Sequence, residues 1–208
     1  MQRAFVGFYW TLPVPWAGFR DLPSDVDAAA RLSLTIRYQR ERVRRWVKDE
    51  GGYLGHEAVF LEIAPDRGSD VVAGPFERAA QMCRAQDATL VLVDFSAVPA
   101  WRSHGLLHDL ARMSGVRIEQ LYPDPVLING KEFDPQQHFE EWRRRQQSWS
   151  ASKPEREAAL LARIAELRGD GSNYAQVADS LNAEGRSTVT GRRWTADGVR
   201  KFVRAVTK

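Results

Sequence analysis

The chain has 208 residues, of which 43% are hydrophobic and 27% are charged, with a formal net charge of +3. These values are typical of a soluble globular protein of one or two domains. The single cysteine, Cys83, excludes a disulfide framework and a cysteine-rich zinc site, and no run approaches the roughly 18 apolar residues of a membrane helix. Because the N-terminus MQRAFVGFYW lacks the pattern of a secretory signal, we expect a cytoplasmic protein.

The basic residues gather at the C-terminal end of the chain. Residues 151–208 contain 11 Lys and Arg residues against 7 Asp and Glu residues, a net charge of +4. The first 150 residues contain 19 against 20, a net charge of −1. A neutral body with a basic end fits a polyanionic partner such as nucleic acid, although a solvated helix face with surplus arginine explains the same charge.

Strand and helix patterns alternate along the first 122 residues, since continuous apolar runs predict buried strands and apolar residues at helical spacing predict helices. In chain order we expect a strand at 4–10, a proline-containing loop at 11–23, a helix from a Ser24-Asp25 cap to Glu50, and a strand at 53–63. A helix at 75–86, a strand at 88–94, a helix at 101–114 and a strand at 116–122 follow. This order predicts an α/β fold with a mostly parallel sheet flanked by helices.

The next segment leaves this alternation. VLINGKEF (126–133) predicts a β-hairpin, because Asn129-Gly130 is a favoured two-residue turn. Asp134 can cap a helix that runs to about Trp149, and the small polar stretch 148–154 is typical of an interdomain linker. We therefore divide the chain into an α/β domain (1–133), a long helix with a linker (134–154) and a C-terminal domain (155–208).

The C-terminal domain is predicted to contain three short helices. The first, at 155–168, has Ala159, Leu160, Ile164 and Leu167 on one side. The second spans 174–183, and the third follows a predicted cap at Thr195. The β-prone stretch 186–194 between them is long enough for a small hairpin or wing. Three short helices of which the third is basic match a helix-turn-helix module, whose recognition helix enters the major groove of DNA.

The third helix separates apolar residues, Val199, Phe202 and Val203, from its cations. We therefore expect double-stranded DNA as the partner, with the outward cations on phosphates or guanine edges. A small helical dimerisation domain is the alternative explanation. The expected DNA-contacting residues of the module are Arg186, Thr188, Arg192, Arg193, Thr195, Arg200, Lys201 and Arg204.

Within residues 174–203 a dense, ordered motif occurs: Val177-Ala178, Leu181-Asn182, Gly185, Thr188, Gly191, Trp194-Thr195, Val199 and Phe202. This pattern resembles the DNA-binding segment of serine site-specific recombinases, the resolvase and invertase family, with its I-A-x-x-L-N-x-x-G helix and its T-x-x-G-x-x-W-T stretch. TIRYQRERVRRWVKDEGG (35–52) and SGVRIEQL (114–121) are similar to parts of the resolvase catalytic domain. The resemblance covers nearly the whole chain and implies a resolvase-like α/β domain.

The same resemblance implies an oligomer. The helix at 134–150 lies where the family places its long dimer helix, so a homodimer or higher homo-oligomer is expected. Its interface residues would be Phe139, Trp142 and Trp149. Arg143, Arg144 and Arg145 would follow the DNA backbone or minor groove.

The family's catalytic residues do not carry over to this chain. The family has an arginine and the nucleophilic serine in a Y-x-R-V-S-T motif on the first strand, where this chain has Gly7 and Tyr9 or, with the register shifted by one, Phe8 and Trp10. After the central strand Asp94 is retained, Phe95 replaces an arginine, and Arg102 is the nearest basic residue. Phosphoryl transfer needs cations around the developing charge. The resemblance therefore implies a catalytically degenerate member with no catalytic residue.

Two histidines, His104 and His108, are one helical turn apart, a spacing that can bind zinc. No third ligand is evident near them in the sequence. We therefore expect structural or surface histidines, with neither a metal nor a cofactor.

Together these patterns predict a non-catalytic, nucleoid-associated regulator of transcription or accessory factor that binds a specific double-stranded DNA sequence as a dimer. One alternative is an active site-specific recombinase with a displaced nucleophile, for which the phenol of Tyr9 is a candidate. Another alternative is a protein-interaction module that has lost DNA binding.

Overall fold

The chain divides into two compact units, and the boundary between them lies inside one helix. The computed structural model describes residues 2–14, 17–62, 70–98, 104–188 and 192–206. The first unit consists of residues 1–14 and 19–142, and the second contains residues 143–208. The division therefore falls between Trp142 and Arg143.

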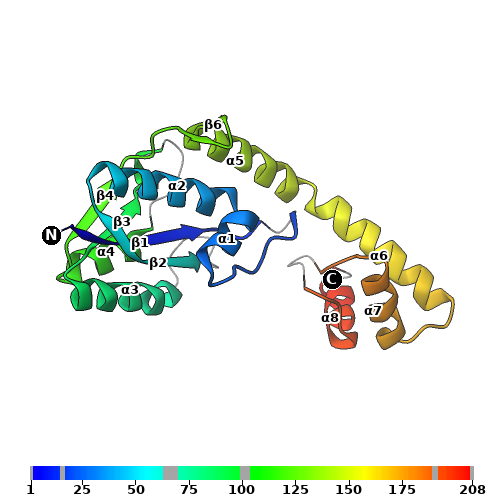
Figure 1. The fold of residues 1–208 in the computed structure, drawn as a ribbon. Coiled ribbons are helices and arrows are strands. Elements are labelled where there is room, and N and C mark those ends of the chain that lie inside the picture. Colours follow the sequence, from blue (N-terminus) through cyan, green and yellow to red (C-terminus); the bar gives the residue numbers. More distant parts are fainter. Residues whose placement is uncertain (1, 15–16, 63–69, 99–103, 189–191, 207–208) are drawn as a thin grey trace. The chain divides into compact units, whose positions relative to one another are not determined.

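A four-stranded sheet forms the centre of the first unit (Figure 1). Its strands are β1 (Ala4–Thr11), β2 (Tyr53–Leu61), β3 (Thr89–Val93) and β4 (Ile118–Leu121). They are all parallel and lie in the order β2-β1-β3-β4, so that β1 and β3 occupy the middle. Strands buried on both faces read as continuous apolar runs, and every residue of β3 is buried. The predicted α/β fold with a parallel sheet is confirmed.

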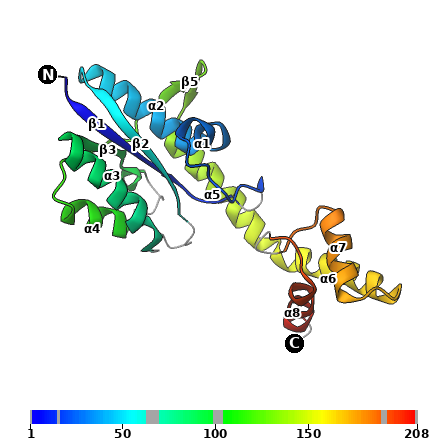
Figure 2. The same cartoon turned by 60° about the horizontal axis from the view of Figure 1, so that its bottom comes forward.

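Helices cover both faces of this sheet (Figures 1 and 2). They are α1 (Val26–Leu32), α2 (Leu34–Asp49), α3 (Ala73–Gln86) and α4 (Gly105–Met113). On one face the ring of Trp46 in α2 meets Phe5 of β1 at 5.3 Å. On the other face Phe76 of α3 meets Phe8 of β1 at 5.9 Å. Because side chains alternate along a strand, the odd-numbered residues of β1 face α2 and the even-numbered ones face α3.

The predicted single helix from Asp25 to Glu50 is wrong, because the chain breaks at Ser33 into α1 and α2. Ser33 has an extended backbone, with φ −123° and ψ 116°. Its Oγ accepts the N–H of Ile36 at 3.3 Å and donates to Oγ1 of Thr11 at 3.4 Å. One hydroxyl therefore caps the second helix and ties the break to the end of β1.

The other predicted elements of this unit are present with shifted ends. The helix predicted at 75–86 begins at Ala73, and of the helix predicted at 101–114 the first three residues lie outside the described ones. The predicted hairpin is confirmed by the antiparallel strands β5 (Val126–Ile128) and β6 (Lys131–Phe133). Its turn residues, Asn129 and Gly130, have φ of 52° and 76°, as a tight two-residue turn requires.

The stretch 148–154, predicted to be a small polar interdomain linker, is helical on both sides of Ser152. α5 (Pro135–Ala151) is followed after Ser152 by α6 (Lys153–Gly169). The N–H of Ser152 donates to the carbonyl of Ser148 at 3.0 Å, and the N–H of Arg156 donates to the carbonyl of Ser152 at 3.1 Å. Pro154 lies in the first turn of α6, where a missing N–H costs nothing.

Three helices enclose the core of the second unit: α6, α7 (Tyr174–Ala183) and α8 (Ala196–Val206). Ala159 is exposed, contrary to its predicted place on the inner side of α6. The predicted hairpin at 186–194 contains no strand in its described residues, and 189–191 lie outside them. The buried residues of this core are Leu160, Ile164, Leu167, Val177, Ala178, Leu181, Trp194 and Val199.

The middle of β1 combines a glycine with a buried tyrosine. Gly7 and Tyr9 point to the same face, and the tyrosine ring lies across the glycine, so a Cβ at position 7 would come within 2.4 Å of the Tyr9 hydroxyl oxygen. That hydroxyl donates to Oε1 of Glu57 on β2 at 2.7 Å. Arg44 of α2 binds both oxygens of the same carboxylate, at 3.1 Å and 2.6 Å. The tyrosine therefore fills the space that a side chain at position 7 would need.

We predict that Gly7→Ala destabilises the first unit by about 1–3 kcal/mol, because the added methyl group overpacks the core against the Tyr9 ring. The midpoint of urea unfolding, followed by circular dichroism, measures this loss. In a Tyr9→Val background the ring is gone, so Gly7→Ala should cost clearly less there. Equal costs in the two backgrounds would show that the tyrosine ring does not impose the glycine.

Candidate nucleic-acid interface

A side-chain clamp fixes the approach to α8 within the second unit. The amide of Asn182, near the end of α7, binds the main chain of Trp194 in both directions. Its Oδ1 accepts the N–H of Trp194 at 2.8 Å, and its Nδ2 donates to the carbonyl of Trp194 at 3.0 Å. The chain just before α8 is therefore hydrogen-bonded to α7, although Trp194 lies twelve positions after Asn182.

The indole of Trp194 continues this attachment into the core. Its ring meets Phe202 of α8 edge-on, with the ring centroids 5.5 Å apart. Leu181 and Val199 are fully buried beside it. The residues of the sequence motif are therefore mostly those that hold α7 and α8 together, and the cations are left on the outside.

α8 begins at Ala196, directly after the Thr195 cap that the sequence predicts. The Oγ1 of Thr195 accepts the N–H of Gly198 at 3.1 Å, which is the geometry of an N-terminal cap. Arg200, Lys201 and Arg204 are all exposed, whereas Val199 is buried. This exposed trio, Arg200, Lys201 and Arg204, is called the α8 cationic face below.

The charges of this face act on a single carboxylate. Nζ of Lys201 lies 2.8 Å from Oδ2 of Asp197, one turn earlier. The Lys201 ammonium, joined by the charges of Arg200 and Arg204, holds the pKa of Asp197 below its usual value. One carboxylate faces three cations, so the surface of α8 keeps a net positive charge.

The other predicted DNA-contacting residues of the module lie before α8. Arg192 and Arg193 are exposed. The N–H of Thr188 donates to the carbonyl of Arg192 at 2.9 Å, and the N–H of Arg192 donates to Oγ1 of Thr188 at 2.8 Å. Nε of Arg186 donates to Glu184 at 2.9 Å. The motif residue Gly191 lies outside the described residues.

The three aromatic residues of the long helix that are predicted to form a dimer interface differ from one another in what they contact. The ring of Phe139 is 5% exposed and meets Phe95 at 5.0 Å, so it packs in the core of its own chain. Trp142 is half-buried against the same core. Trp149 stacks on the guanidinium of Arg156 in the second unit.

The three arginines on the same helix belong to the second unit. Arg144 and Arg145 are exposed, and Arg143 is half-buried.

The positions expected to correspond to a recombinase pocket hold a buried phenol. Tyr9 is fully buried, and its burial raises the pKa of the phenol well above the usual value, with the nearby Glu57 carboxylate adding to the rise. The phenol is therefore protonated at neutral pH and donates inward. At the end of β3 the carboxylate of Asp94 accepts the N–H of Ser96 at 2.9 Å, Phe95 is buried, and Arg102 lies outside the described residues.

A buried acid–imidazole pair, which the sequence did not reveal, lies at the carboxyl ends of the strands. Oε2 of Glu62, just after β2, is 2.7 Å from Nε2 of His104, just before α4. Both side chains are almost completely buried. Nδ1 of His104 accepts the N–H of Leu107 at 3.3 Å, so Nε2 is the nitrogen that donates to the carboxylate. The pair ties the end of β2 to the start of α4, 42 residues later.

The second histidine of the predicted i, i+4 pair has its own partner. Nε2 of His108 lies 3.9 Å from Oδ1 of Asp94, and its side chain is one-third exposed. Nowhere in the described part of the chain do three His, Cys, Asp or Glu side chains gather as a metal site would require. The contact with Glu62 gives His104 a structural position between β2 and α4.

Comparisons with protein-family models, with curated proteins and with solved structures gave no match to this chain. The resemblance to serine recombinases consequently rests on the motif residues themselves. Of the helices that the structure describes, none is long and apolar enough to cross a membrane.

We predict that Asn182→Ala loosens α8, because both hydrogen bonds to Trp194 are lost at a cost of about 1–3 kcal/mol. Hydrogen–deuterium exchange should show faster exchange in residues 196–206, with α2 unchanged as an internal reference. Asn182→Asp keeps the acceptor and loses the donor, so its exchange should be intermediate. Unchanged protection of α8 in the alanine variant would disprove the clamp.

A second prediction concerns the buried pair. His104→Ala takes the imidazole away from a fully buried carboxylate, and we expect a loss of about 3–5 kcal/mol in the free energy of unfolding. Urea unfolding followed by circular dichroism measures it. His108→Ala, one turn along the same helix and partly exposed, is the matched control and should cost less than about 1 kcal/mol. Similar losses in the two variants would contradict the special role of the Glu62–His104 contact.

Proposed function

We propose that this protein binds double-stranded DNA through the second unit and does not cleave it. The observation that carries the proposal is the α8 cationic face, which stands exposed on a helix whose inner side is fixed by a buried core and by the Asn182 clamp. A helix held by its inner side, with exposed cations on its outer side, matches the way a recognition helix presents itself to the major groove.

The chemistry of the exposed residues supports a nucleic acid over other polyanions. Arg200 and Arg204, one turn apart on α8, can give bidentate contacts to guanine edges or to phosphates. Lys201 adds a compact ammonium charge. Arg192 and Arg193 add two exposed cations just before the helix. The alternative of a small dimerisation domain gives no role to five exposed cations.

Two features support a non-catalytic role. The position of the recombinase serine is occupied by Tyr9, whose hydroxyl is buried and hydrogen-bonded to Glu57. The position of an active-site arginine is Gly7, where the Tyr9 ring leaves no room for a side chain. On this proposal the chain derives from a serine recombinase and acts as a sequence-specific regulator or accessory factor, working as a dimer.

We predict that a triple variant, Arg200→Gln with Lys201→Gln and Arg204→Gln, loses most of its affinity for duplex DNA while keeping its thermal unfolding midpoint. Fluorescence anisotropy with a labelled mixed-sequence duplex at several salt concentrations measures the affinity. The slope of log affinity against log salt should flatten by about 0.9 for each phosphate contact removed.

The matched control removes three exposed cations from the first unit instead: Arg31→Gln, Lys48→Gln and Arg112→Gln. It should bind DNA like the unchanged protein. Equal losses in the two triple variants would show that net charge, and not α8, governs binding. A covalent protein–DNA adduct on supercoiled plasmid would overturn the non-catalytic part of the proposal.

A further inference from the structure

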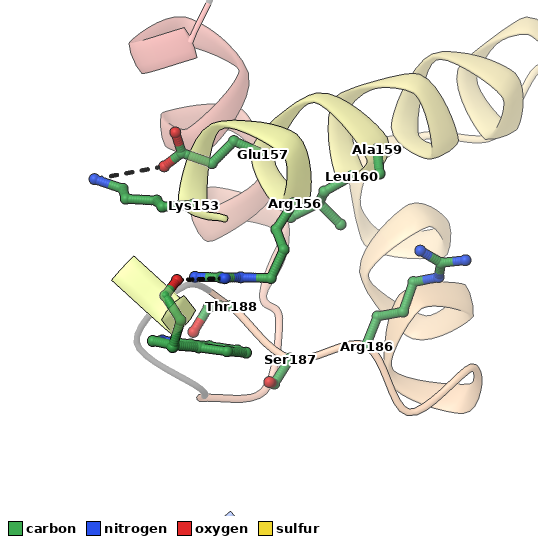
Figure 3. A pocket seen from close by; sticks show the side chains of 9 residues that line it. Lys153, Arg156, Glu157, Ala159, Leu160, Arg186, Ser187 and Thr188 are labelled. Carbon is green, nitrogen blue, oxygen red and sulfur yellow. Dashed lines mark hydrogen bonds and ion pairs between the residues drawn. The ribbon is translucent and has the colours of Figure 1, made fainter. Parts of the chain in front are cut away.

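A groove of about 250 Å³ lies within the second unit, between the start of α6 and the segment that follows α7 (Figure 3). One wall carries Lys153 and Arg156, and the other carries Arg186, Ser187 and Thr188. Three cations and two hydroxyl groups therefore line it. Its one acid, Glu157, lies 3.7 Å from Nζ of Lys153, so the groove as a whole is positively charged.

Arg156 is the most firmly positioned cation of this groove. Its guanidinium carbon lies 3.5 Å from the centroid of the Trp149 ring. Its Nη1 donates to the carbonyl of Trp149 at 2.5 Å and also to Oγ of Ser152. Stacking and two hydrogen bonds thus fix the plane of the guanidinium, while no carboxylate among the described residues pairs with it.

The fixed orientation leaves the other side of the guanidinium free for a ligand. Nε and Nη2 of Arg156 make no hydrogen bond to the part of the chain that the structure describes. Two adjacent N–H groups in a rigid fork match two oxygens of one phosphate. The hydroxyl of Ser187 and the ammonium of Lys153 supply further donors on the two walls.

The groove also connects to the cationic surface before α8. Thr188 in its wall exchanges two hydrogen bonds with the exposed Arg192, through the Thr188 N–H and the Thr188 Oγ1. The groove also has an apolar surface, formed by Trp149, Ala159 and Leu160, which suits a sugar ring better than a second charge. A polyanion that reaches α8 by way of Arg192 therefore meets a prepared anion site next to it.

We propose that this groove holds one backbone phosphate, with its deoxyribose, of the DNA duplex that the second unit binds, and that Arg156 grips that phosphate with its free fork. This inference rests on the proposed DNA binding and adds a contact outside α8. It also assigns a role to the stacked pair of Trp149 and Arg156.

The test compares Arg156→Gln and Arg156→Lys with the unchanged full-length protein on a mixed-sequence duplex, by anisotropy over a range of salt concentrations. We expect Arg156→Gln to weaken binding about tenfold, as loss of a charged hydrogen-bonding group does, and to flatten the salt slope by about 0.9. Arg156→Lys keeps the charge and loses the fork, so it should keep the slope and still bind more weakly. Arg112→Gln, an exposed cation of α4, is the charge-matched control and should bind normally.

The outcomes separate this inference from the proposed function. If the α8 triple variant loses binding and Arg156→Gln binds like the unchanged protein, the groove inference falls and the proposed function stands. If the unchanged protein shows no salt-dependent binding to duplex DNA, both fall. If Arg156→Gln abolishes binding to polyglutamate and leaves DNA binding intact, the groove takes an acidic protein segment and the inference is overturned. Circular dichroism melting of each variant distinguishes loss of contact from loss of fold.

Discussion

The architecture of the first unit depends on burying β1 on all sides. This strand pairs with β2 along its whole length and with β3 on its other edge, and nearly all its side chains are buried between two helical layers. A segment in this position can carry no unpaired charge, because burying one costs several kcal/mol. The hydroxyl of Tyr9, in the middle of the strand, accordingly donates a hydrogen bond to Glu57. The carboxylate of Glu57 is in turn bound by Arg44. Helices α2 and α3 pack against the side chains on the two opposite faces of the same strand.

The second unit separates the residues that fold it from the residues that stay exposed. The core and the clamp are formed by Leu181, Asn182, Trp194 and Val199, whereas the cations of α8 are exposed. This division makes the proposed function testable, since the cations can be changed without disturbing the core. It also explains why the motif places many specific residues on α7, on the loop and on α8. Residues from all three segments contact one another and together hold α8 in place.

Local patterns sufficed for much of this structure. The apolar run at 88–94 predicts β3, Asn129-Gly130 predicts the hairpin, and Thr195 predicts the start of α8. The break at Ser33 was missed because its hydroxyl is anchored by Thr11, a partner 22 residues away.

Contacts between residues far apart in the sequence account for the other features that the sequence patterns did not predict. The pairing of Glu62 with His104, and the stacking of Trp149 on Arg156, need residues that no periodicity connects. The helix through 148–154 was missed because small polar residues suit a linker and a helix alike. In the candidate interface, the exposed cations were predictable from the sequence, and the clamp behind them was not.

The packing of Tyr9 over Gly7 also has a consequence for how this sequence can change over time. As long as the tyrosine is present, position 7 accepts only glycine without strain, and a smaller residue at position 9 would leave a void and remove the hydroxyl that donates to Glu57. Neither site can therefore change alone without a loss of stability. The two residues are an epistatic pair, so an accepted substitution at one of them requires a matching substitution at the other.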